Sequence, residues 1–346
     1  MRITNGMMIK RYTQNTNSNL REMNRVSQQI ASGRRFERGS EDPVRALKAL
    51  QVRRGISALE QYSANIDTVD TWLRQTETAV MAIKTSADRA VDLIIQGRND
   101  VLAPEDRMII ATSLRSIQEA VLKDLNTQMA GKYLLGGANT KETPFTVDDT
   151  TGHLLFNGES VFDAAKFEDL DGMQHPVYVD LTGEFKYKDA SLDEFVDKGA
   201  VFNMYTTGIE IIGVGPNNLY NLIGRIADAF ESEYKTGENR MADIDGPITG
   251  DSDYDGEFGL FKRLQEKQHE TVIELVKVGE KANFAAYLKD RTENNLYESQ
   301  VMQNKLEMIP ADEAILNYKL QDYIYKACLQ MSTYIFQPSL IDYLGR

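Results

Sequence analysis

The sequence has a single cysteine, which excludes an internal disulfide framework and any multi-cysteine zinc or iron–sulfur site. Its three histidines, His153, His175 and His269, lie far apart, which argues against a histidine-based metal site or catalytic triad. No run of about 18 apolar residues is present to span a membrane. The N-terminus lacks a charged segment leading into an apolar one, so we expect no cleavable secretory signal.

Basic residues are scarce in the middle of the chain. Residues 143–255 carry 7 Lys and Arg against 23 Asp and Glu. Residues 1–142 carry 21 against 16, and residues 256–346 carry 11 against 13. This change in composition indicates a distinct domain inserted between two flanking regions. Because an acidic surface repels phosphates, the charge also argues against binding of nucleic acid.

Proline and apolar spacing predict one very long helix near the N-terminus. Asp42 and Pro43 suit a helix start, because the missing N–H of proline would be unpaired in the first turn anyway. Apolar residues then keep a four–three spacing up to Gly97, and the next proline is Pro104. A helix over 43–97 would be about 80 Å long at 1.5 Å per residue, which predicts a rod.

Similar signals predict helices along both flanking regions. A first helix ends at Gly33, and others cover residues from Pro104, 218–233, about 258–309 and the stretch after Pro310. The sequence therefore predicts a mainly α protein. Its N- and C-terminal regions would form a long antiparallel helical coiled coil, because that is the simplest way to bury both apolar seams.

The inserted region reads as short strands. Asn157-Gly158 is typical of a type I′ turn and predicts a β-hairpin. Gly208–Gly215 is expected to be a strand that ends in a turn, and the stretch from Val201 to Ile212 adds β-branched and aromatic residues. Further strand candidates are Val177–Val179, Phe185–Tyr187 and the residues following Val201.

Three motifs resemble parts of catalytic or binding sites, and each lacks a required residue. Asp251–Gly256 begins like a calcium-binding loop, but Lys262 stands where a bidentate Glu is needed, and cation binding is left open. His269-Glu270 begins like a zinc-protease motif, but Ile273 replaces the second His. The glycines of 208–215 lack the third glycine of a dinucleotide fingerprint. We therefore expect no catalytic, cofactor-binding or metal-binding residues.

Other chemically distinctive residues have structural explanations. Trp72 lies on an apolar seam and is expected in the core. Cys328 is expected to act as a small buried apolar residue, since no His lies near it in sequence. A basic group is interpreted as a solvated or intersubunit loop: Arg34, Arg35, Arg38 and Arg45.

Motifs at both ends of the chain resemble one family. Ser32–Phe36 followed by Ser40–Val44 resembles the N-terminal signature of the flagellin superfamily. The Asp-Pro pair in that signature, the run Gly131–Gly137 and the ending Pro338–Leu344 resemble the branch of hook–filament junction proteins. The match covers about residues 1–145 and 216–346.

The resemblance implies a non-enzymatic structural subunit of the bacterial flagellum that joins hook to filament. Such a subunit is exported through the flagellar type III channel with an export chaperone. Outside the cell it assembles as a ring of copies between hook-associated protein 1 and flagellin. The resemblance implies no cofactor, no nucleic acid and no membrane partner. Three alternatives stay open: flagellin itself, a flagellin-like secreted adhesin that uses residues 146–215, and a flagellin-like protein with a protease insert.

The pattern and the resemblance together predict three domains. A terminal helical assembly domain comprises 1–42 and 310–346, a helical rod domain comprises 43–145 and 216–309, and a β-rich outer domain comprises 146–215. The terminal segments are expected to pair only on assembly. The interface is expected to use ten apolar side chains: Ile9, Leu20, Met23, Ile30, Leu320, Ile324, Met331, Ile335, Leu340 and Leu344.

Overall fold

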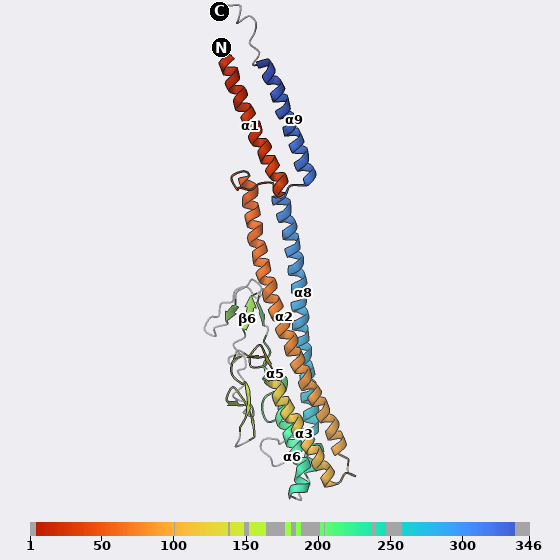
Figure 1. Ribbon diagram of the computed structural model, residues 1–346. Coiled ribbons are helices and arrows are strands. Elements are labelled where there is room, and N and C mark those ends of the chain that lie inside the picture. Colours follow the sequence, from red (N-terminus) through yellow and green to blue (C-terminus); the bar gives the residue numbers. More distant parts are fainter. Residues whose placement is uncertain are drawn as a thin grey trace, which may run out of the picture. The chain divides into compact units, whose positions relative to one another are not determined.

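The chain divides into two units, each held by its own internal contacts. Unit 1 comprises residues 1–60 and 294–346, and unit 2 comprises residues 61–293. The division into three domains stays a prediction. The computed structural model (Figure 1) describes residues 5–99, 101–137, 139–148, 152–163, 177–180, 185–187, 201–203, 205–236, 240–246 and 258–335.

Helices account for most of the described residues, as the sequence predicts (Figure 1). Pro43 begins a helix of 55 residues and Gly97 ends it, which confirms that prediction. None of the helices in the described ranges has an apolar stretch sufficient to span a lipid bilayer. The helices are α1 (Asn5–Ser32), α2 (Pro43–Gly97), α3 (Pro104–Leu125), α5 (Gly208–Ile212), α6 (Leu219–Thr236), α7 (Met241–Asp245), α8 (Leu260–Glu307) and α9 (Ala311–Ile335).

The described strands form three small antiparallel sheets in unit 2. Asn157 and Gly158 join β4 to β5 with φ angles of 50° and 87°, so the predicted type I′ turn is confirmed. The strands are β1 (Gln128–Met129) with β2 (Lys132–Tyr133), β3 (Phe145–Val147) with β4 (Leu154–Phe156) and β5 (Glu159–Ser160), and β7 (Phe185–Tyr187) with β6 (Val177–Asp180) and β8 (Val201–Asn203).

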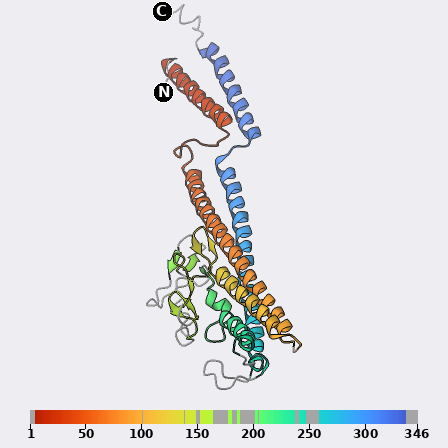
Figure 2. The same cartoon turned by 60° about the horizontal axis from the view of Figure 1, so that its bottom comes forward.

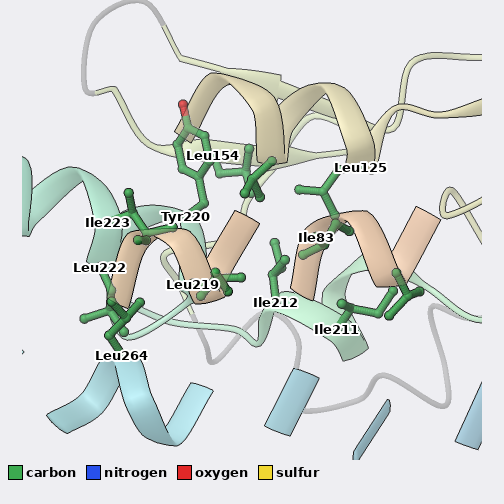
Figure 3. Packing of buried hydrophobic residues seen from close by; sticks show 14 of the residues in the cluster. Ile83, Leu125, Leu154, Ile211, Ile212, Leu219, Tyr220, Leu222, Ile223 and Leu264 are labelled. Carbon is green, nitrogen blue, oxygen red and sulfur yellow. The ribbon is translucent and has the colours of Figure 1, made fainter. Parts of the chain in front are cut away.

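The core of unit 2 lies where its helices and the β3–β5 sheet converge. Each fully buried aliphatic side chain there is worth about 1.5–3 kcal/mol relative to exposure. The close approach of Phe230 to α2 needs a glycine at position 97, because a Cβ on Gly97 would lie 2.6 Å from the ring of Phe230. Figure 3 shows how side chains from α2, α3, β4, α5, α6 and α8 pack together: Ile83, Leu125, Leu154, Ile212, Leu222 and Leu264.

The expectation of a strand over Gly208–Gly215 is wrong, because Gly208–Ile212 form the helix α5. The carboxylate of Glu210 accepts a hydrogen bond of 3.4 Å from the N–H of Thr207, as in a capping box. The helix buries Ile209, Ile211 and Ile212 in the core. Capping and burial on a helical face therefore outweigh the strand preference of the isoleucines.

Candidate assembly surface

In unit 1, α1 and α9 lie side by side and antiparallel, as both views show (Figures 1 and 2). The hydroxyl of Tyr12 donates a hydrogen bond of 2.9 Å to the carbonyl oxygen of Cys328. The side-chain amide of Asn19 donates one of 3.2 Å to the Sγ of the same cysteine. Segments more than 300 residues apart therefore pair within one chain, although the sequence assigned this pairing to the assembled state.

The seam between α1 and α9 contains both polar and apolar side chains. On α1, the residues at four–three spacing from the contacts with α9 include Thr16 and Val26, and the buried apolar one is Val26 at 3% exposure. On α9 the corresponding buried residue is Ala314 at 2%, and its half-buried neighbours include Asn317 and Gln321. Fully buried apolar side chains are therefore few in the described part of the seam, and half-buried ones such as Leu20 and Ile324 accompany them.

A different face of α9 carries four large and exposed apolar side chains. They are spaced by four, three and eight residues, which places them along one side of the helix. The exposed fractions are 68% for Leu316, 56% for Leu320, 71% for Tyr323 and 59% for Met331. We call these four residues the α9 stripe. Contiguous exposed apolar surface of this kind marks an interaction site.

The structure distributes the predicted interface residues between the seam and the solvent. Ile9, Leu20 and Met23 are half-buried on α1, whereas Ile30 is exposed. Ile324 is half-buried on α9.

Leu320 and Met331 belong to the exposed α9 stripe and are not covered by α1. Ile335 ends α9, but its side chain lies outside the described part, as do Leu340 and Leu344. The use of these ten residues in assembly stays a prediction.

Two ion pairs lie beside the segments that connect α1 to α2 and α8 to α9. The guanidinium of Arg35 donates hydrogen bonds of 3.1 and 2.9 Å to the two carboxylate oxygens of Glu313. Arg53 on α2 makes a similar pair with Glu307 at the end of α8, at 2.7 and 2.6 Å. The sequence did not reveal these pairs, because the partners are 278 and 254 residues apart.

The Arg53–Glu307 pair shifts the pKa of both side chains. Glu307 is 8% exposed, and burial alone would raise the pKa of its carboxyl. The hydrogen bonds from Arg53 outweigh burial and hold the pKa of Glu307 below its usual value. The same contact raises the pKa of Arg53.

Replacing Glu307 by Gln should destabilise the protein in a pH-dependent way. The folded-state pKa of Glu307 lies below the unfolded value of about 4.3, so its stabilising effect is complete above that pH and is lost as the pH falls through the folded-state pKa. We expect Glu307→Gln to cost about 1–3 kcal/mol at pH 7 and less at pH 3.5, measured by thermal unfolding with circular dichroism.

Asp124→Asn is the control, because the pKa of Asp124 is shifted in the opposite direction to that of Glu307. Burial raises the pKa of Asp124, so its ionisation opposes folding and this penalty disappears on acidification. The control should show no loss of stability at pH 7. A deficit for Glu307→Gln that is equal at both pH values would contradict the assignment.

The other distinctive residues within the described ranges are either packed in the core or exposed. Trp72 is 4% exposed, as predicted, and its ring meets that of Tyr205 edge-on with centroids 5.4 Å apart. Lys281 donates a hydrogen bond of 3.2 Å to the carbonyl of Tyr205, and burial lowers its pKa. His269 is exposed on α8. Asp251–Gly256 lies outside the described residues.

Metal-ligating side chains do not cluster in the described ranges. No group of three or more His, Cys, Asp or Glu residues among them is placed to hold a metal ion. The features left to interpret are therefore the α9 stripe and the charged connections of unit 1.

Parts of the chain are similar in sequence to known proteins. Residues 3–140 match the family described as the bacterial flagellin N-terminal helical region. Flagellar hook-associated protein 3 of Salmonella typhimurium is 26% identical over 153 residues, which cover 44% of this chain and 48% of that protein. The protein of the same name from Escherichia coli is 23% identical over 162 residues, which cover 46% and 50%. The chain thus spans about half the length of these curated relatives.

A solved structure supports the fold. A Vibrio parahaemolyticus protein, provisionally described as a flagellar hook-associated protein, aligns with a TM-score of 0.56 and 18% identity. The alignment covers 78% of this chain and 100% of that one. Residues 3–140 are thus similar to the N-terminal helical region of bacterial flagellins, and part of the chain is similar to flagellar hook-associated protein 3, which confirms the resemblance seen in its sequence motifs.

Proposed function

We propose that the protein is a structural subunit of the bacterial flagellum that joins the hook to the filament. The observation that carries the proposal is the α9 stripe, which stays exposed although α9 is already paired with α1. A paired helix that still exposes four large apolar side chains along one side has a second surface available for contact. The likeness to hook-associated protein 3 supports the flagellum as the place where this happens.

Assembly would use the helical termini. The α9 stripe of one subunit would pack against the terminal helices of a second copy, and repetition of this contact would close a ring. The neighbours would be hook-associated protein 1 on the hook side and flagellin on the filament side. An export chaperone would deliver the subunit to the outside of the cell. The role would be structural, without a cofactor.

Deletion of the gene in its host, followed by electron microscopy, tests the proposal. We expect hooks without filaments and flagellin monomers released into the medium. Restoring the gene on a plasmid should restore filaments. Intact filaments on the deletion strain would overturn the proposal and would favour a role outside the junction.

A further inference from the structure

The two chain connections of unit 1 lie against each other. One joins α1 to α2, and the other joins α8 to α9. Arg34 and Met308 form an antiparallel bridge between them. The N–H of Arg35 donates to the carbonyl of Glu307 at 2.7 Å, and the N–H of Ile309 donates to the carbonyl of Gly33 at 3.0 Å. The connections are therefore held together by their own backbones.

Side chains extend this contact to helices on both sides. The guanidinium of Arg35 reaches the carboxylate of Glu313 in the first turn of α9. The carboxylate of Glu307 is held in turn by Arg53 on α2. Glu313, Arg35, Glu307 and Arg53 thus form one continuous chain of contacts that runs from α9 through both connections to α2.

The network is tied to α1 as well. The side-chain amide of Gln29, which is 7% exposed, donates a hydrogen bond of 2.6 Å to the carbonyl of Arg35. The ion pairs lie beside cavities of about 240 and 220 Å³, which are lined by Arg35 with Glu313 and by Arg53 with Glu307. These polar contacts therefore connect α1 and α9 to both chain connections, in addition to the contacts along the α1–α9 seam.

We infer that this network is a latch, through which the adjoining ends of α1, α2, α8 and α9 open and close as one cooperative unit. Breaking the Arg35–Glu313 pair weakens the backbone hydrogen bond between Arg35 and Glu307. Because the carboxylate of Glu307 is bound by Arg53, the Arg53–Glu307 pair is weakened as well. The contacts of the described residues include none between Glu313 and Arg53. Two independent surface ion pairs would each contribute little and would not influence each other.

Hydrogen exchange on the purified full-length chain tests the latch. Glu313→Gln should speed exchange about threefold or more at amides of residues 26–33 and 303–309, on helices other than α9. Asp312→Asn is the matched control, because Asp312 is also in the first turn of α9 but makes no ion pair within the described ranges. It removes the same charge and should leave both regions unchanged. Faster exchange confined to α9 in the Glu313 variant would overturn the latch.

A double-mutant cycle separates coupling from simple destabilisation. We compare Glu313→Gln, Arg53→Gln and the double variant. The exchange rate of residues 303–309 in the double variant should differ at least about twofold from the product of the two single effects. Additive effects would show two independent ion pairs and would also overturn the inference. Neither readout depends on assembly, so failure of the latch leaves the proposed function standing, and the reverse also holds.

Discussion

Leu320→Glu should leave the host with hooks that carry few or no filaments. The side chain is 56% exposed in the α9 stripe, so a charge is tolerated in the isolated chain. In an assembled contact the same carboxylate would be buried without a partner, which costs several kcal/mol, and each 1.4 kcal/mol lowers an association constant about tenfold. We expect the fraction of hooks bearing filaments to fall at least about tenfold by electron microscopy, with an unchanged circular dichroism spectrum.

Leu329→Glu controls for the added charge. Leu329 lies on α9 outside the stripe and is 44% exposed, so it receives the same substitution on the same helix. Filaments should form at nearly normal frequency with this variant. If the two variants lose filaments equally, the stripe has no special role and the assembly proposal loses its structural support.

Phe230→Ala should destabilise unit 2 by about 3–5 kcal/mol, because it empties a large and fully buried site. Phe230 is 0% exposed, and its ring fills the space left by Gly97. Trp72 is the single tryptophan of the chain and lies in the same core, so its fluorescence reports the unfolding of unit 2. The urea midpoint of this signal should fall accordingly.

Phe284→Ala is the control for the loss of an aromatic side chain. Phe284 is 45% exposed on α8, where its ring stacks loosely on Tyr287 with centroids 6.5 Å apart. Its replacement should cost less than about 1 kcal/mol. A similar loss of stability in both variants would show that the Phe230 site is not a tightly packed part of the core.

The helices could be predicted because their signals are local. Pro43 and Gly97 mark the ends of α2, and Gly33 closes α1 with a φ of +68°. The Asn157-Gly158 turn was equally clear, because its two residues fix a single turn type. The helix α5 was missed although Thr207 and Glu210 show the capping-box spacing, because the isoleucines between and after them favour a strand.

The candidate site was less predictable, because it depends on distant partners. The four–three spacing of apolar residues in α9 identifies an apolar face but does not say which neighbour covers it. The structure turns that face away from α1, and the seam combines polar side chains such as Asn19 and Asn317 with apolar ones such as Val26. The Arg35–Glu313 and Arg53–Glu307 pairs likewise have no sequence signature, because nothing local specifies the carboxylate that each arginine meets.

The position of Cys328 makes its thiol a natural probe of the contact between α1 and α9. Its thiol is the only one in the chain and accepts a hydrogen bond from Asn19 inside the α1–α9 seam. A thiol reagent attacks the thiolate, and access to it increases whenever the two helices separate. The rate of labelling, compared with that in denaturant, therefore reports how strongly the seam protects this half-buried thiol in the native protein, without any engineered probe. The same measurement on the assembled structure would show how far neighbouring subunits slow the opening.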